Sequence, residues 1–269
     1  MMNTLKFKYV LTIVGIIFLI ASCKKAKPRK EEKPVETDKP IITDPVKKQF
    51  IPIKLESENL IINLKYVENS ALISEVNSSD GYSVKITYQD QLPFECLKYK
   101  SKIPFKSIYF RKTANTDLKV TFFDIDGKVD TPTGSLMLTR NTKEQLISIQ
   151  ASGDGPSYPY KESTWSYSSA GNVSGIIVKG SPNDASPIKY THDEKNGIFK
   201  NVQHAQLLFL EMGYSFFCAD TNNRLSYSNT DKPLENTDFS YQYNSDDYPK
   251  QFTILQSKQT FKITYTELK

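Results

Sequence analysis

Short segments in which polar and apolar residues alternate dominate the chain from residue 50 onward, and they restrict the fold more than any other feature. Alternation with a period of two is typical of antiparallel strands that have one polar and one apolar face. The segments predicted to be strands are 82–88, 117–123, 135–140, 145–151, 164–169, 173–180, 239–243, 250–256 and 260–268. The 16 tyrosines and 15 phenylalanines support this prediction, because aromatic side chains pack well on half-buried sheets.

A weak internal repeat joins several of these strands in pairs. Residues 167–177 align with residues 243–254, residues 123–129 give a third copy, and residues 138–149 give a degraded fourth. In each copy a cluster of Asp, Asn or Gly follows a strand, as in a hairpin. Hairpins in sequence order build a meander, which must curl, split or close to protect its edges. We therefore expect an all-β domain: a strongly curved antiparallel β-meander or a partly open barrel.

One stretch, residues 196–213, departs from the alternating pattern. Its apolar residues, among them Phe199, Val202 and Leu207, recur at mixed spacing, and Gly213 follows as a candidate C-cap. The pattern predicts one short helix over about residues 202–212, covering an open end or the concave side of the sheet.

Three sequence stretches resemble a known family. They are the hairpin repeat, "KYTHDEKNGIFKNV" at residues 189–202, and the closing "YNSDDYPKQFTI" and "FKITYT" at residues 243–254 and 261–266. Over roughly residues 60–269 the chain is similar to a family of Bacteroidetes lipoproteins of unknown function with a porin-like fold. The chain differs in having His192 where an aromatic residue is usual and Gly197 where proline is usual. The resemblance implies a curved β-meander, a lipid anchor and no assigned activity, and a distant likeness to tyrosine-aspartate repeat proteins is compatible with it.

The N-terminus has the parts of a bacterial export signal. Two lysines precede an apolar core at residues 10–20, which is shorter than the roughly 20 residues of a membrane span. The sequence "LIASC" at residues 19–23 then resembles a lipobox, in which the cysteine is acylated. We expect residues 1–22 to be a lipoprotein signal peptide and Cys23 to be the lipidated residue that anchors the protein to the membrane. The alternative is a plain signal peptide followed by an incidental cysteine.

Residues 23–48 are predicted to form a charged tether that contains proline, and residues 49–269 the β-meander domain. The tether has nine basic and five acidic residues and lacks aromatic side chains, so it cannot bury enough apolar surface to fold. The chain has a formal charge of +5. When the two lysines of the signal and the net four positive charges of the tether are subtracted, the domain has a formal net charge close to −1. The basic character therefore belongs to the tether, which either contacts anionic headgroups or is a solvated linker, and it does not indicate a nucleic-acid partner.

Cellular placement and redox state are only partly constrained. Lys24 follows the cysteine, which is compatible with an outer-membrane lipoprotein facing either the periplasm or the cell surface. Cys96 and Cys218 are the remaining cysteines, and both lie among apolar residues. They form either a disulfide or two separate buried thiols.

The sequence offers little catalytic or metal chemistry. Two histidines exclude a histidine-rich metal site, and no Cys/His spacing fits zinc. A serine hydrolase would need His192 or His204 as its base, and we expect His192 in a solvated turn and His204 on the helix. Asp124-Ile125-Asp126-Gly127 resembles the opening of a calcium loop but lacks the later acidic ligand, so a hairpin turn explains it better. We expect no cofactor, no metal, no catalytic residue and no enzyme; a hydrolase with paired carboxylates is a distant third alternative.

Aromatic residues are the remaining functional candidates. Trp165 and Tyr167 alternate on one predicted strand, and Tyr241 and Tyr243 on another, so each pair faces one side. Such residues either stack on sugar rings or an extended peptide, or belong to the core. The sequence therefore predicts an envelope protein that binds carbohydrate or peptide. The alternative is a scaffold that pairs with a partner through open sheet edges.

Overall fold

The computed structural model describes residues 48–113, 117–126, 130–152, 162–179, 188–208 and 220–268. The chain divides into two compact units, Met1–Pro45 and Val46–Lys269, and every described residue belongs to the second. Cys23, the predicted signal peptide and nearly all of the predicted tether therefore lie outside the described residues.

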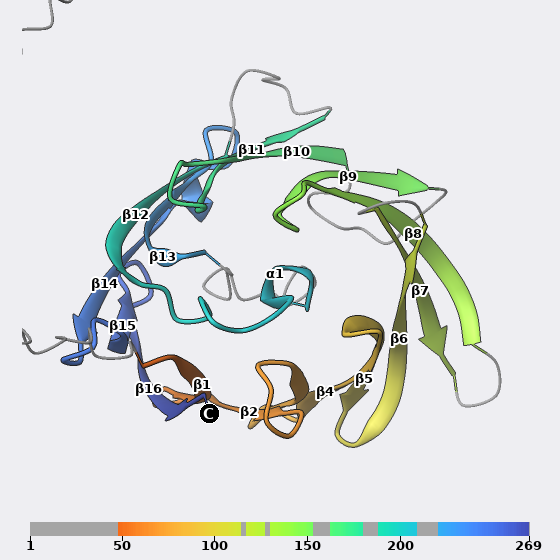
Figure 1. The fold of residues 1–269 in the computed structure, drawn as a ribbon, viewed down its shortest axis with the longest axis horizontal. Coiled ribbons are helices and arrows are strands. Elements are labelled where there is room, and N and C mark those ends of the chain that lie inside the picture. The colour runs from red at the N-terminus through yellow and green to blue at the C-terminus, as the bar shows by residue number, and fades with distance from the viewer. Residues whose placement is uncertain are drawn as a thin grey trace, which may run out of the picture. The chain divides into compact units, whose positions relative to one another are not determined.

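In the described part of the second unit, sixteen antiparallel strands form a closed barrel (Figure 1). Each strand pairs with its neighbours in sequence, and β1 pairs with β16 to complete the ring. The strands are β1 Phe50–Glu56, β2 Ile61–Tyr66, β3 Ile73–Ser78, β4 Tyr82–Gln89, β5 Leu92–Lys100, β6 Ile103–Lys112, β7 Leu118–Ile125, β8 Asp130–Arg140, β9 Leu146–Ser152, β10 Glu162–Tyr167, β11 Val173–Val178, β12 Ile188–Asn196, β13 Asn222–Ser228, β14 Thr237–Tyr243, β15 Pro249–Ile254 and β16 Gln259–Glu267. A single turn of 3₁₀-helix, η1 Pro233–Glu235, precedes β14.

The predicted fold class is confirmed: the domain is an all-β meander of hairpins, and each of the nine predicted strands corresponds to an observed one. The barrel is closed, which goes further than the partly open form that the sequence suggested. Because β1 and β16 pair with each other, neither has an open edge, and the scaffold alternative loses the surface it required.

The strands alternate between the two faces of the barrel wall. In β16, Phe261 and Ile263 are buried, whereas Lys262 and Thr264 are exposed. The same main core contains buried side chains from strands β1 to β9 and β14 to β16, including Leu55, Ile62, Val84, Ile108, Phe122, Leu138 and Phe252. The buried apolar side chains of these strands therefore face the inside of the barrel.

A segment of the chain fills the interior. Residues 197–208, here called the plug, leave β12 and lie inside the ring of strands, where Figure 1 shows helix α1 (Ala205–Leu208). Five plug side chains belong to the main core: Ile198, Phe199, Val202, Ala205 and Leu207. A Cβ atom on Gly197 would come within 2.4 Å of the Asp220 carbonyl oxygen, so the chain can enter the barrel here only with glycine.

The predicted helix is only partly correct. The described part of α1 is a single turn, and residues 202–204, which were expected to be helical, form bends and turns. His204 has a positive φ of 57°, a backbone conformation outside the right-handed helix. Residues 209–212 of the prediction lie outside the described residues.

Hydrogen bonds join the plug to one end of the barrel. Asn201 donates to the Phe50 carbonyl oxygen at 2.9 Å, the Gln203 amide donates to the Ala71 carbonyl at 3.1 Å, and Gln206 accepts from the Leu146 amide at 3.2 Å. We call this the plugged end; it includes the turns at residues 67–72, 90–91, 141–145, 168–172 and 244–248. Alternate turns of a meander lie at opposite ends, so the far end includes the turns at residues 57–60, 79–81, 101–102, 229–236 and 255–258.

Candidate functional site

The four aromatic candidates lie on two separate strands. Trp165 and Tyr167 are half-buried on β10, Tyr241 and Tyr243 are half-buried on β14, and three strands separate the pairs. Trp165 and Tyr241 pack against the main core. Tyr167 packs against a second, smaller core formed by Val173, Ile176, Ile188, Tyr190 and Tyr227.

Their polar groups bond within the barrel. Tyr167 donates to the Leu146 carbonyl oxygen at 2.8 Å, and Tyr241 donates to the Arg224 carbonyl oxygen at 2.7 Å. Two other tyrosines, Tyr66 and Tyr88, bond in the same way to a carbonyl of the preceding strand, that of Pro52 or of Ile73. The remaining two candidates also have partners, since Trp165 donates to Ser163 and Tyr243 to Asp193. A ligand-binding role for these aromatics stays a prediction, and their polar groups serve the barrel itself.

His192 is not in a solvated turn, as the sequence suggested; it lies in β12 with only 9% of its side chain exposed. Its Nε2 is 3.0 Å from the Asp220 carboxylate, which also accepts from Arg224 at 3.0 Å and from the Val173 amide at 2.8 Å. Burial would raise the pKa of Asp220, but the charges of Arg224 and His192 and these hydrogen bonds outweigh it and lower the pKa to about 2. The Arg224 guanidinium also lies 3.7 Å from the centre of the Tyr190 ring. This buried network joins β12 to the start of β13.

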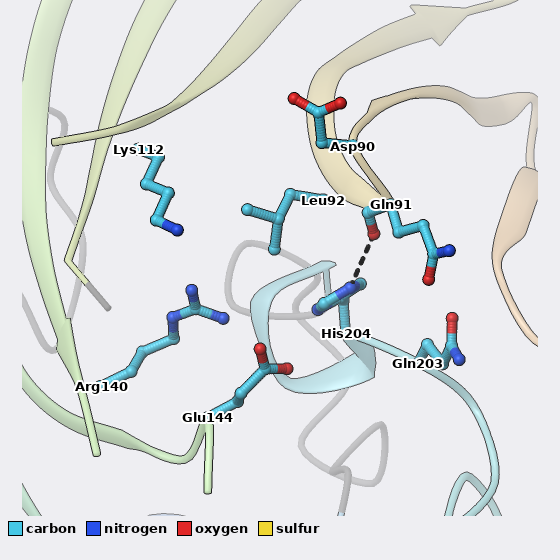
Figure 2. A pocket seen from close by; sticks show the side chains of 8 residues that line it. All are labelled: Asp90, Gln91, Leu92, Lys112, Arg140, Glu144, Gln203 and His204. Carbon is cyan, nitrogen blue, oxygen red and sulfur yellow. Dashed lines mark hydrogen bonds between the residues drawn. The ribbon is translucent and has the colours of Figure 1, made fainter. Parts of the chain in front are cut away.

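A polar pocket of about 600 Å³ opens between the plug and the inner wall at the plugged end (Figure 2). We call it the plug pocket. It is lined by Asp90, Gln91, Leu92, Lys112, Arg140, Glu144, Gln203 and His204. Figure 2 shows Lys112 and Arg140 on the wall that faces Gln91 and Gln203.

Tight turns bring these residues to the pocket. Asp90 and Gln91 form the two-residue turn between β4 and β5, with φ values of 50° and 61° that suit a type I′ hairpin. Glu144, in the turn between β8 and β9, has a φ of 62°. Lys112 and Arg140 are the last residues of β6 and β8. The pocket therefore combines three hairpin ends with the plug.

Histidine 204 connects the plug to the pocket wall. Its Nε2 lies 2.9 Å from the Gln91 carbonyl oxygen, shown as the dashed line in Figure 2. A carbonyl only accepts, so Nε2 carries the proton and donates. Burial lowers the pKa of His204 more than this hydrogen bond and the nearby Glu144 raise it. The ring is therefore neutral at pH 7, and its Nδ1 is a hydrogen-bond acceptor.

Charges of both signs face the pocket. Asp90, Lys112 and Glu144 are exposed, and none of the three forms an ion pair in the described structure. The Arg140 side chain is buried, with 5% exposure. Chemically, the site can hold a cationic group against the carboxylates and an anionic group against the lysine.

Of these eight residues, only His204 is a candidate that the sequence alone offers. The others come from four segments far apart in the chain, and no local motif marks them. The register of the closed barrel brings them together, so a sequence without an alignment carries no signal for this site.

The other sites predicted from the sequence show no ligand-binding geometry among the described residues. Asp124 is in β7 opposite Lys106, and residues 127–129 of the calcium-like motif lie outside the described residues. Cys96 is buried on β5, and Cys218 lies outside the described residues. Within the described ranges no group of three or more His, Cys, Asp or Glu side chains is placed to hold a metal ion. In those same ranges no helix has the length and apolarity to cross a membrane.

The fold defines the class of protein: a closed sixteen-stranded antiparallel meander with an internal plug, porin-like in strand number and connectivity. No protein-family model and no curated protein matches the chain. Among solved structures, it is similar to a porin-like protein from Bacteroides uniformis at 13% identity, over 81% of this chain and 97% of that chain, with a TM-score of 0.34.

Proposed function

We propose that this protein is a lipid-anchored protein of the bacterial cell envelope whose barrel binds short peptides in the plug pocket. The observation that carries the proposal is the set of charges in that pocket. Asp90, Glu144 and Lys112 face one cavity without ion-pair partners among the described residues. A cation and carboxylates around one cavity complement the ammonium and carboxylate groups of a peptide.

The size of the pocket agrees with such a ligand. Its volume of about 600 Å³ lies within the usual range for small-molecule sites. Gln91 and Gln203 add amide groups that both donate and accept, as peptide recognition requires. The neutral His204 ring contributes an acceptor at Nδ1.

Peptide fits this site better than carbohydrate. Sugar-binding sites use aromatic rings on which the sugar stacks, and among the described residues no aromatic side chain lines the plug pocket, where Leu92 is the one apolar residue. A neutral sugar would also leave the charges of Lys112 and Glu144 uncompensated. Carbohydrate remains the competing ligand in the experiment below.

A binding experiment tests the pocket. The chain from residue 23 onward, carrying Cys23→Ser, is applied to arrays of short peptides with unblocked termini and of glycans, and the hits are measured by calorimetry. Lys112→Ala or Glu144→Ala removes a charge-assisted hydrogen bond of about 1.5–3 kcal/mol, so each is expected to weaken peptide binding at least tenfold. The control is Lys119→Ala, an exposed lysine on β7. Binding to glycans alone, or equal affinity in all three variants, contradicts the proposal.

The anchor rests on the lipobox-like sequence that ends at Cys23 and on the resemblance to Bacteroidetes lipoproteins. Labelling cells with radioactive palmitate is expected to mark the parent protein in the outer membrane and to leave Cys23→Ser unlabelled and soluble. Protease treatment of intact cells then distinguishes the surface from the periplasmic face. Release of the parent protein without any label contradicts the anchor.

A further inference from the structure

Among the described residues of the far end, the β5–β6 hairpin has the highest local density of basic side chains. Its turn, Ser101 and Lys102, has φ values of 50° and 70°. The Ser101 amide donates to the Gly81 carbonyl oxygen at 2.8 Å, which joins this turn to the neighbouring turn between β3 and β4. The tip of the hairpin is therefore held in a fixed position.

Four lysines occupy nine consecutive residues of this hairpin: Lys98, Lys100, Lys102 and Lys106, here called the lysine tip. Lys98 and Lys106 lie directly opposite each other on β5 and β6, an arrangement of like charges that normally destabilises a sheet. Acidic residues also lie nearby: Asp80 in the adjoining turn, Asp124 opposite Lys106, and Asp126 just beyond Asp124.

Most of these cations have no ionic partner. In the described ranges Lys100, Lys102 and Lys106 form no ion pair. Other surface lysines do form pairs: Lys48, Lys54, Lys65, Lys179, Lys195 and Lys232 each lie within 3.2 Å of a carboxylate oxygen. Because the whole domain has a formal charge close to −1, the lysine tip is a local concentration of positive charge.

Apolar side chains accompany the lysines. Ile103, next to the turn, is 67% exposed, and Tyr82, at the start of β4, is 42% exposed. The Lys100 Nζ lies 5.5 Å from the centre of the Tyr82 ring, and that ring contacts Phe105 edge to face at 6.2 Å. Exposed apolar and aromatic groups beside several lysines match the boundary between headgroups and acyl chains of a membrane.

We infer that the lysine tip docks on the surface of a lipid bilayer that contains anionic headgroups. The lysines supply electrostatic attraction, and Ile103 and Tyr82 enter the interfacial layer. The plug pocket is at the opposite end of the barrel, so docking leaves it facing away from the bilayer. This inference does not depend on the pocket or on acylation, since it concerns the barrel itself.

Vesicle sedimentation tests the inference. The chain from residue 23 onward with Cys23→Ser, which cannot be acylated, is mixed with vesicles of phosphatidylcholine alone or with 30% phosphatidylglycerol. Binding is expected only to the anionic vesicles. Each lysine near an anionic surface contributes roughly fivefold to the partition coefficient, so Lys100→Glu with Lys102→Glu is expected to reduce it by at least tenfold.

The matched control reverses the charge of two exposed lysines elsewhere, with Lys250→Glu on β15 and Lys262→Glu on β16, and keeps the tether unchanged. This control is expected to retain most of the binding to anionic vesicles. Ile103→Ser leaves the charge unchanged and is expected to lower the partition coefficient severalfold. Circular dichroism melts confirm that each variant is folded. An equal loss in the control, equal binding to neutral vesicles, or binding to soluble polyanions such as heparin but not to vesicles overturns the inference.

Discussion

The two ends of the barrel use polar side chains in opposite ways. At the plugged end, Asn201 and Gln206 bond to backbone groups of the barrel and hold the plug, and Asp220 accepts hydrogen bonds from the Val173 amide and from Arg224. At the far end, short turns close the hairpins, and Lys100 and Lys102 of the tip are exposed and form no ion pair in the described structure. The difference teaches that substitutions in the plug and in the buried network around Asp220 change stability, whereas those in the lysine tip change what the surface attracts.

The largest expected effect is at the plug itself. Phe199 is fully buried among core residues of the barrel, so Phe199→Ala is expected to lower the free energy of unfolding by about 4 kcal/mol. Phe105→Ala at the far end, where the ring is half-buried, is the matched control and is expected to cost less than half as much. Chemical denaturation of both variants measures the difference. An equal loss of unfolding free energy in the two variants would contradict the difference proposed between the two ends.

Proline accounts for some of the strands that the sequence does not predict. Three of the seven missed strands, β1, β5 and β6, contain Pro52, Pro93 and Pro104, which argue against a strand. Each of these prolines lies beside a shift in strand register, where a missing amide is tolerated. Proline can be accommodated in this barrel because of bulges, and a bulge depends on the neighbouring strand.

The plug and the pocket depend on closure of the ring, which is a long-range property. The mixed apolar spacing around Phe199 and Val202 predicts a helix, yet these side chains are buried because the segment is surrounded by strands. His192 illustrates the same limit: its acidic neighbours suggest a solvated turn, but Asp220 and Arg224 approach it from another segment of the chain. Local pattern therefore predicts the wall, and only the assembled barrel reveals what lies inside it.

The second prediction concerns the buried acid at the plugged end. Asp220→Asn removes the charge that compensates Arg224 and is expected to cost about 3 kcal/mol of stability. The exposed turn residue Asp80 gives the control, and Asp80→Asn is expected to change stability by less than about 0.5 kcal/mol. Thermal unfolding near pH 7 measures both, and a cost below 1 kcal/mol for Asp220→Asn contradicts the role assigned to the network.

The same acid gives a pH dependence of stability. Its pKa is about 2 in the folded protein and 3.8 in the unfolded chain, so the unfolded state binds the proton first. The stabilisation, about 2 kcal/mol, is complete above pH 4 and is lost as the pH falls from about 3.8 toward 2. Unfolding free energies measured across this range should fall more steeply for the parent than for Asp220→Asn. If the unfolding free energies of the two proteins fall in parallel with pH, protonation of Asp220 does not contribute to the pH dependence of stability.

The smallest expected effect distinguishes structural tyrosines from exposed ones. Tyr167→Phe removes a hydroxyl that donates to the Leu146 carbonyl and accepts from Gln206 at 2.7 Å, so the buried partners lose a bond and stability falls by about 1.5 kcal/mol. Tyr82→Phe at the far end removes an exposed hydroxyl and should leave stability unchanged within about 0.5 kcal/mol. Because the plug pocket is lined by neither residue, peptide affinity should stay the same in both variants. If Tyr167→Phe instead lowers peptide affinity and leaves the free energy of unfolding unchanged, the aromatic residues are favoured as the ligand site. A tyrosine with a purely structural role would change stability as well.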